Sequence, residues 1–218
     1  MPLGGLGAQG EPLGKLLVHA AARGDVQGAS AMLSSPGVLV DTVDANGWTA
    51  LHHAARQGHA ELASLLLAAG AQPSPLSRTG PCTPLHCAAR ADGAGAAPAE
   101  VVHLLLRYDA DPRERDHRQQ TPLHVAAKCG NVGAARALLA DVRIDPTALD
   151  IDGKAAIQWA TQLGHAELAR LVPSSGPPMT TLKLLRKQIL AERKAAEAKQ
   201  VKARGTSAAR RPASAVTL

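Results

Sequence analysis

Three histidines, His52, His86 and His124, stand at equivalent places in the sequence and are the side chains best suited to chemistry. Imidazole groups bind metals and act as general bases near neutral pH. Either activity requires the rings to converge on one point. Each histidine belongs to its own copy of a recurring phrase, however, and packed helices lie about 10 Å apart. The spacing therefore predicts a structural role for each histidine and no shared metal or catalytic site.

Two cysteines flank one of these histidines, which raises the alternatives of a zinc half-site or a nucleophile with its base. Cys82 and Cys87 enclose His86, but no second ligand pair stands at zinc-binding spacing. A cysteine nucleophile also needs a third group that orients its base. The sequence predicts neither a metal nor enzymatic activity. With Cys129 the cysteines number three, and this odd number argues against a disulfide framework and favours a reducing, intracellular compartment.

The segment Gly5-Leu6-Gly7-Ala8-Gln9-Gly10 matches the glycine pattern of a dinucleotide-binding loop. Such a loop binds pyrophosphate only when a strand precedes it and a helix follows it. Four residues precede Gly5, and Glu11-Pro12 follows the last glycine. The sequence therefore predicts no cofactor.

The histidines belong to a seven-residue phrase that recurs at a nearly fixed distance. Its copies begin at Thr49, Thr83 and Thr121, and a weaker copy begins at Ala155. These starts are 34, 38 and 34 residues apart. Self-similarity with a period of roughly 20–50 residues is typical of stacked-repeat proteins. The phrase therefore predicts a single solenoid.

The phrase Thr121-Pro122-Leu123-His124-Val125-Ala126-Ala127 and its flanks resemble the ankyrin repeat family, whose signature is T-P-L-H-x-A. Asp44-Ala45-Asn46-Gly47 and Gly58-His59-Ala60-Glu61-Leu62 match the segments around that signature. The resemblance implies an all-α solenoid of about five helix-pair repeats with projecting turns. It also implies that each histidine hydrogen-bonds near the threonine of its own phrase. The structural motif residues are then Thr49, His52, Thr83, His86, Thr121 and His124.

The residue types predict the same repeat unit. Threonine caps a helix with its hydroxyl, and proline suits the first helical position. Each phrase should begin a short helix, which Gly58 or Gly130 ends because glycine adopts the left-handed conformation without strain. In the second helix, Leu62, Leu65 and Leu66 form the expected buried stripe. One helix pair cannot bury its own apolar face, so neighbouring repeats must stack.

The expected organisation places a disordered N-terminus at residues 1–13 and the repeat domain at residues 14–172. The five repeats are assigned to residues 14–43, 44–77, 78–115, 116–149 and 150–172. The first and last depart from the phrase and are expected to be caps. Five extra residues within 92–98 predict a longer loop between the helices of repeat three. A linker (173–178), a basic amphipathic helix (179–204) and a disordered tail (205–218) complete the chain.

Positive charge is concentrated in the basic helix and the tail. The formal net charge is +6, and residues 183–211 contain ten Lys or Arg against two Glu, which leaves a net of −2 for the remainder. Four roles stay open for the helix: capping repeat five, docking to a partner, contacting nucleic acid, or lying on a membrane surface. No apolar run is long enough to span a membrane, so we expect no stable membrane insertion and a cytoplasmic or nuclear location.

The resemblance implies that a partner protein binds on the concave face, formed by the turn tips and the exposed sides of the first helices. The matching positions are Trp48, Asn46, Arg56, Gln57, Arg90, Arg118, Gln120 and Lys128. Lys154 and Gln162 take such positions in repeat five. The cations favour an acidic or phosphorylated partner, the alternative being that they are solvated surface charge. Trp48 is the first candidate for a hot spot, the alternative being that it packs on its own repeat, whereas Trp159 is expected in the core.

The function that fits best is a non-catalytic adaptor or scaffold that binds an unidentified protein. The alternative is a nuclear, nucleic-acid-associated or transcription-regulatory factor that acts through the basic helix at 179–204. Salt-dependent nucleic-acid binding that disappears without residues 179–218 would favour this alternative. The oligomeric state cannot be predicted from the sequence.

Overall fold

The computed structural model describes residues 13–77, 80–91 and 98–172. These residues form ten α-helices in five consecutive pairs, and their only extended pairing is an isolated β-bridge between Val43 and Thr49. The expected all-α class with about five helix pairs is confirmed. The helices are α1 (Leu13–Arg23), α2 (Val26–Leu33), α3 (Ala50–Gln57), α4 (Ala60–Ala68), α5 (Pro84–Arg90), α6 (Pro98–Arg107), α7 (Pro122–Cys129), α8 (Val132–Leu139), α9 (Ala156–Gln162) and α10 (Ala166–Leu171).

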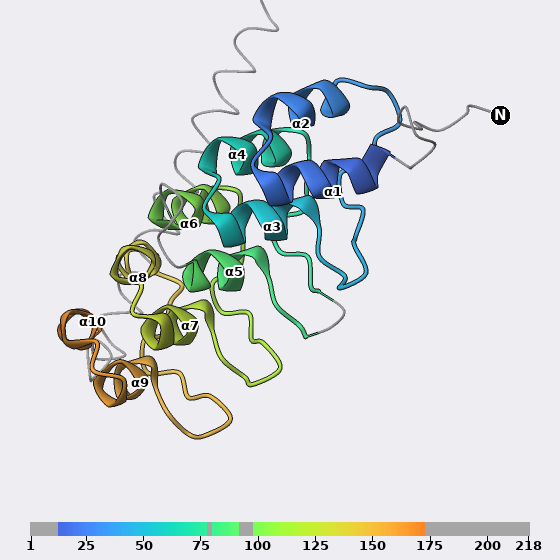
Figure 1. The fold of residues 1–218 in the computed structure, drawn as a ribbon. Helices are drawn as coiled ribbons and strands as arrows, with labels where there is room; N and C mark the ends of the chain where they lie inside the picture. Colours follow the sequence, from blue (N-terminus) through green and yellow to red (C-terminus); the bar gives the residue numbers. More distant parts are fainter. Residues whose placement is uncertain (1–12, 78–79, 92–97, 173–218) are drawn as a thin grey trace, which may run out of the picture. The chain divides into compact units, whose positions relative to one another are not determined.

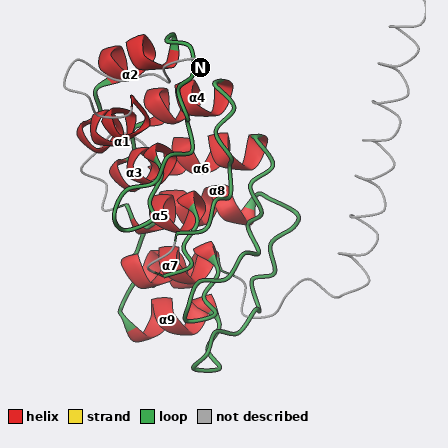
Figure 2. Ribbon diagram, turned by 90° about the vertical axis from the view of Figure 1, so that its right-hand side faces the viewer, coloured by secondary structure: helices red, strands yellow, loops and turns green. Residues whose placement is uncertain are grey.

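The pairs stack so that first helices pack on first helices and second helices on second helices (Figure 1). Helix α3 contacts α1 and α5, and α7 contacts α5 and α9, while α6 contacts α4 and α8 in the other layer. Long turns between the pairs run along one side of the helices (Figure 2). We name the surface made by these turns and the exposed sides of α1, α3, α5, α7 and α9 the first-helix face.

The recurring phrase begins the first helix in three of the repeats. Thr49, Thr83 and Thr121 are N-cap residues with extended backbone, and Pro84 and Pro122 occupy the first helical turn. Proline is tolerated there because its missing N–H would have no intrahelical partner. The threonines therefore start the helices where the sequence predicts.

Glycine ends two of these helices, as expected. Gly58 and Gly130 are the C-cap residues of α3 and α7, with φ of 73° and 70°. Side chains with a Cβ rarely adopt this left-handed conformation, so glycine allows the chain to reverse directly into the second helix.

The core consists mainly of leucines and alanines, which both the first and the second helices contribute. Ala54, Ala55 and Leu62 are fully buried, and equivalent residues of the neighbouring repeats continue the same cluster. The alanines let adjacent first helices approach closely. The expected leucine stripe needs one correction: Leu67 is buried, whereas Leu65 is half-exposed. Leu65 faces away because the groove between the second helices leaves its side uncovered.

The expected repeat boundaries stay predictions, and the bounds of the helices can be set beside them. Helix α1 begins at Leu13, one residue before the expected domain boundary. Residues 91–97 separate α5 from α6, whereas only residues 58–59 separate α3 from α4, so the insertion of repeat three does fall between its helices. The expected disordered N-terminus was residues 1–13, of which Leu13 is helical and the rest lie outside the described residues. The expected linker (173–178), basic helix (179–204) and tail (205–218) also lie outside them. Within the described ranges, no helix is long and apolar enough to cross a membrane.

Candidate partner-binding surface

The histidines of the recurring phrase join each first helix to its own turn and to the next repeat. The Thr49 hydroxyl lies 2.9 Å from Nδ1 of His52, and the Thr49 backbone N–H donates to the same nitrogen at 3.1 Å. On the other side of the ring, Nε2 lies 2.9 Å from the carbonyl oxygen of Cys82 in repeat three. One side chain thus organises the start of α3 and the turn of the following repeat.

His86 and His124 make the same connections, reaching the carbonyl oxygens of Gln120 and Lys154 at 2.9 and 3.1 Å. A carbonyl oxygen can only accept, so Nε2 carries the proton and Nδ1 accepts from the threonine. Burial lowers the pKa of all three histidines. Both nitrogens of each neutral ring are occupied, which leaves no accessible base. In the described part of the chain, no three His, Cys, Asp or Glu side chains gather as possible metal ligands.

An aspartate at the start of each regular turn shapes the part of the first-helix face that projects. Asp44 accepts hydrogen bonds from the backbone N–H groups of Asn46 and Trp48, at 2.8 and 2.9 Å. Asp116 and Asp150 hold the turns of repeats four and five in the same way. These carboxylates accept hydrogen bonds from backbone N–H groups within their own turns.

The turn of repeat three is longer and has a serine at this position. The Ser77 N–H donates to the carbonyl of Cys82 at 3.2 Å, whereas the Asp44 N–H donates to the carbonyl of Trp48, one residue nearer along the chain. The Ser77 hydroxyl donates to the carbonyl of Gly80 within the turn. This geometry places Cys82 at the position that Trp48 holds in repeat two.

Gln120 requires a correction, because the residue expected to contact a partner is only 2% exposed. Its Nε2 donates to Asp150 of the next repeat at 2.9 Å, and the Trp159 indole N–H donates to the same oxygen at 2.7 Å. Burial by itself would raise the pKa of Asp150, but these donors and the Lys154 N–H lower it to about 2. Gln120 therefore joins repeat four to repeat five and is unavailable to a partner.

Trp159 is half-buried at the first-helix face instead of enclosed in the core. The ammonium groups of Lys128 and Lys154 lie 4.4 and 4.3 Å from its ring centroid. Lys154 also donates to Gln162 at 2.8 Å, so its position is held from two sides. Cation–π contacts at exposed sites contribute about 0.5–1 kcal/mol each. Repeats four and five thus present two ordered positive charges around one aromatic ring.

Trp48 packs largely on its own repeat, as its alternative prediction proposed. The indole stacks on His52 with centroids 5.9 Å apart and meets His53 at 5.1 Å, and it also contacts the hydrophobic core. His53 Nε2 lies 2.9 Å from the Asp44 carboxylate, which anchors the other end of this group. The indole is partly buried, so Trp48 combines a structural contact with a partly exposed edge.

The remaining candidates lie on the surface. Asn46 and Gln57 are exposed, at the tip of a turn and at the end of α3. Arg90 and Arg118 are also exposed, whereas Arg56 is half-buried and donates to the carbonyl of Arg90 at 3.2 Å. Because Arg56, Arg90 and Lys128 end successive first helices, their charges follow one another along the array.

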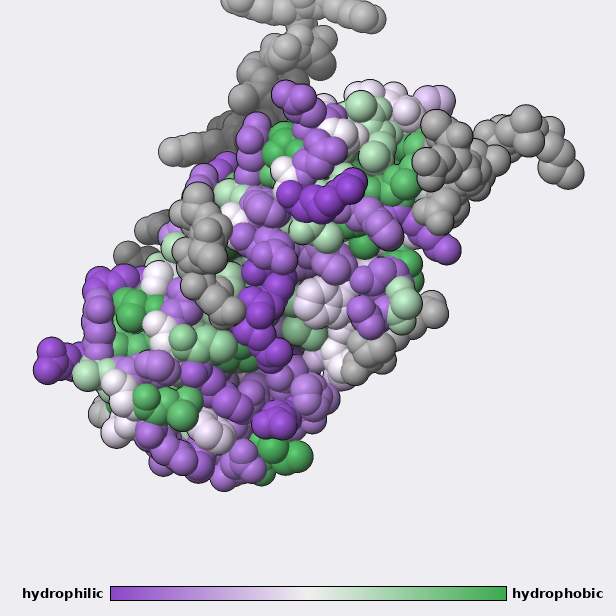
Figure 3. All heavy atoms as spheres, viewed as in Figure 1, coloured by the Kyte–Doolittle hydropathy of each residue, from purple (hydrophilic) through white to green (hydrophobic). Residues whose placement is uncertain are grey.

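The first-helix face is mainly hydrophilic, with scattered apolar patches (Figure 3). A groove of about 410 Å³ lies between α1 and the turn of repeat two. Lys15 and His19 line one side of it, and Val43, Asp44 and Ala45 line the other. The face therefore offers polar and charged contacts over its length and a small hollow near its N-terminal end.

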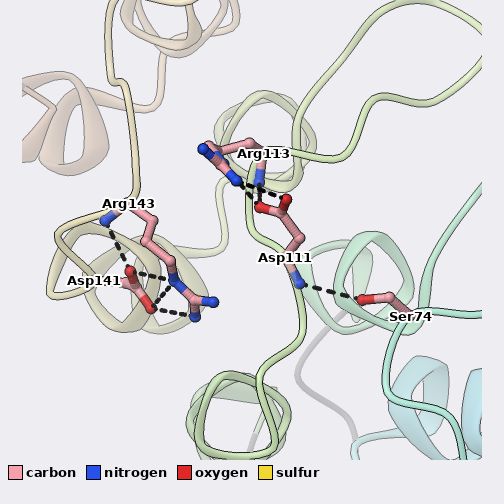
Figure 4. Close-up of polar contacts among 5 residues, drawn as sticks. All are labelled: Ser74, Asp111, Arg113, Asp141 and Arg143. Carbon is pink, nitrogen blue, oxygen red and sulfur yellow. Dashed lines mark hydrogen bonds and ion pairs between the residues drawn. The ribbon is translucent and has the colours of Figure 1, made fainter. Parts of the chain in front are cut away.

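The sequence analysis missed a second set of polar contacts, in the loops after the second helices (Figure 4). Arg113 donates to both carboxylate oxygens of Asp111 at 3.0 Å, and Arg143 binds Asp141 in the same manner. The side-chain hydrogen bond from Arg113 holds the pKa of Asp111 below its ordinary value. The Asp111 N–H donates to the Ser74 hydroxyl of the preceding repeat at 3.2 Å. The shared Asp-x-Arg spacing was the signal that could have revealed these contacts.

The amino-acid sequence is similar to a protein family model and to known proteins. A family model described as ankyrin repeats (3 copies) matches residues 16–116 and 93–180. The chain is similar to neurogenic locus notch homolog protein 2 of Homo sapiens, with 36% identity over 136 residues, which cover 61% of this chain and 5% of that protein. It is also similar to neurogenic locus notch homolog protein 1 of Danio rerio, with 34% identity over 139 residues, covering 63% of this chain and 5% of that protein.

The chain spans only 5% of the length of the curated relatives that it matches. The matched segments contain most of the described chain. They include all three threonine–histidine pairs that hydrogen-bond within a repeat. Ankyrin repeats are in general non-enzymatic protein-protein interaction modules. The family model agrees with the paired helices, the projecting turns and the threonine–histidine hydrogen bonds of the structure. The chain therefore belongs to the ankyrin repeat family.

Proposed function

We propose that this protein is a non-catalytic adaptor that binds an acidic or phosphorylated segment of a partner protein on the first-helix face. The observation that carries the proposal is the run of cations Arg56, Arg90 and Lys128 at the ends of α3, α5 and α7. Arg118 and Lys154 extend this positive charge to the turns of repeats four and five. Arginine and lysine form strong charge-assisted hydrogen bonds with carboxylate and phosphate groups.

The arrangement of the carboxylates supports the same polarity. Asp44, Asp116 and Asp150 accept backbone hydrogen bonds inside their turns, and Asp116 and Asp150 are buried. These three carboxylates are therefore engaged within their own turns, whereas Arg90, Arg118 and the acidic Asp152 of the repeat-five turn are exposed. An anionic partner segment meets mainly positive charge, which speeds association and selects against basic partners.

Order in this surface favours binding. The turns are held by side-chain to backbone hydrogen bonds, and Lys128 and Lys154 are positioned on the Trp159 ring. A surface that is ordered before binding loses less conformational entropy when the partner docks. Because this chain spans only 5% of the notch homolog protein, we propose a binding role and carry over no activity of that whole protein.

The proposal is tested by affinity capture with charge-reversed baits. We expect Arg90→Glu with Arg118→Glu to abolish capture of a partner that the unmodified chain retains, because two exposed cations of the first-helix face become anions. The matched control is Arg107→Glu with Arg170→Glu, which makes the same change in net charge at exposed positions on second helices. Equal capture by both variants would contradict the proposal. Captured proteins are identified by mass spectrometry, and circular dichroism checks each fold.

A fourth bait, which lacks the basic segment, distinguishes the alternative function. If a chain that ends at residue 176 captures no partner while the Arg90→Glu, Arg118→Glu variant still does, the basic segment at 179–204 is the effector. Nucleic acid bound by the full chain and lost at high salt would then favour the nuclear, nucleic-acid-associated role. An intracellular location, cytoplasmic or nuclear, remains a prediction from the cysteine content.

A further inference from the structure

The two cysteines of repeat three lie side by side at the start of α5. The Cys82 and Cys87 sulfurs are 3.7 Å apart. The proposed binding role does not involve either thiol. Cys82 precedes the N-cap residue of α5, and Cys87 lies on α5 itself. A disulfide has an S–S distance of about 2.05 Å, so the two sulfurs must approach by rotation of their side chains before they bond.

The two thiols differ in environment. Cys82 is half-buried, whereas Cys87 is only 2% exposed. A hydrogen bond from the Cys87 thiol lowers the pKa of Cys82, and the nearby Arg90 and Arg56 act in the same direction, against burial and Asp116. The same contact and burial raise the pKa of Cys87. Reactive cysteines occupy such electropositive, partly accessible sites, and redox-sensitive ones have a resolving cysteine beside them.

We propose that Cys82 and Cys87 form a peroxide-oxidised dithiol, in which Cys82 reacts first and Cys87 resolves it. The Cys82 thiolate attacks one oxygen of hydrogen peroxide, forming an S–O bond while the O–O bond breaks and hydroxide leaves. The Cys87 sulfur then attacks the Cys82 sulfenic acid, and the S–S bond forms as the S–O bond breaks. The Cys87 proton leaves with the displaced hydroxide as water, so the two thiols lose two electrons and peroxide is reduced to water.

The disulfide changes a defined part of the molecule. The Cys82 carbonyl accepts hydrogen bonds from His52 Nε2 and from the Ser77 N–H, so this residue links α3, the turn of repeat three and α5. A covalent bond to Cys87 fastens the turn directly to α5. Reduction by a cellular thiol restores the original pair. This inference concerns a modification site and does not depend on the proposed partner.

Peptide mapping of the reduced full chain tests the proposal, because trypsin separates the relevant cysteines. Cleavage after Arg78 and Arg90 releases residues 79–90 with both Cys82 and Cys87, and cleavage after Lys128 releases Cys129 in a different peptide. After substoichiometric peroxide and then iodoacetamide, we expect the 79–90 peptide to lose the mass of two hydrogens and to carry no alkyl group. The peptide with Cys129, an exposed residue, should remain alkylated and serves as the internal control.

Two variants define the order of reaction. Cys87→Ser should accumulate a sulfenic acid on Cys82 that dimedone traps, and Cys82→Ser should leave Cys87 reduced because that thiol is buried. A disulfide between Cys129 and either other cysteine, or faster oxidation of Cys129, would overturn the proposal. Oxidation of Cys87 in Cys82→Ser at the unmodified rate would overturn the assigned order. The unmodified chain alone decides the main question if either variant unfolds.

Discussion

The buried histidines show how this protein satisfies polar groups inside a stacked core. His52, His86 and His124 are at most 1% exposed, yet each ring nitrogen has a hydrogen-bond partner. An unpaired buried polar group costs about 1–3 kcal/mol, so a ring that satisfies the threonine and the next carbonyl together stabilises both segments. Their neutral state also makes the stability of the fold depend on pH.

We expect the free energy of unfolding to decrease as the pH falls below about 6.5, the ordinary value for histidine. Folding lowers the pKa of all three rings, so below about pH 6.5 the unfolded chain binds more protons than the folded chain. The contribution of the neutral histidines to stability is therefore fully present above this pH and is lost as the pH falls. Urea unfolding at about pH 7.5 and about pH 5.5 measures the effect.

The variant His86→Leu tests the origin of this pH dependence. It should destabilise the fold by about 1–3 kcal/mol, because the Thr83 N–H and the Gln120 carbonyl lose their partner, and it should reduce the pH slope. His117→Leu is the control, since His117 is exposed in a turn. An unchanged pH slope in His86→Leu would assign the effect to other groups.

At the scale of the helices, short elements depend on their ends. Helices α3 and α7 have eight residues each, too few to be stable alone, and both begin with a threonine–histidine pair and end with a left-handed glycine. The glycine also permits a close contact between repeats: His165 lies against Gly130 and its Nε2 is 3.2 Å from the Lys128 carbonyl. Both the left-handed backbone at position 130 and the close approach of His165 therefore require glycine there.

Two glycines only three positions apart should respond in opposite ways to alanine. Gly130→Ala should destabilise the protein by more than about 1 kcal/mol, because φ is 70° and the new Cβ would lie 2.7 Å from the His165 ring. Gly133→Ala should stabilise it by about 0.5–1 kcal/mol, because this exposed helical position has room for a methyl group. Thermal and urea unfolding of both variants provide the comparison, and equal shifts would refute the assigned role of Gly130.

For the whole repeat array, stability is a sum of repeats and of their interfaces. Adjacent helices form these interfaces, and polar bonds strengthen them, such as those from Asn131 to the carbonyls of Ala89 and Ala91. The bond between Gln120 and Asp150 performs this function for repeats four and five. A substitution at one interface should therefore reduce the stability mainly of the two repeats that share that interface.

We expect Asp150→Asn to increase hydrogen exchange in α9 and α10 while α3 and α4 keep their protection. The side chains of Gln120 and Trp159 both donate to one carboxylate oxygen of Asp150, and an asparagine NH₂ group at that place cannot accept. Loss of a hydrogen bond to a charged group costs about 1.5–3 kcal/mol. Mass spectrometry of exchanged peptides locates the change. Asp152→Asn, at an exposed position of the same turn, is the control. Equal loss of protection across all repeats would indicate a single cooperative unit.

The sequence by itself determined the repeat unit, because that information is local. The threonine caps, the glycines after α3 and α7 and the Ala-Ala packing follow from the conformational preferences of neighbouring residues. The recurrence of the phrase then determined the stack, since an isolated helix pair leaves its apolar face exposed. Even the position of the insertion between α5 and α6 could be inferred from spacing alone.

Only the tertiary structure decided which candidate residues remain accessible. Gln120 resembles its exposed equivalents in sequence, but Asp150, 30 residues further on, draws its side chain into the interface. Trp159 occupies a core-like position, yet lysines from two repeats meet its ring at the surface. Periodicity places residues within one repeat, whereas the partner of each buried polar atom comes from the neighbouring repeat and depends on how the two stack.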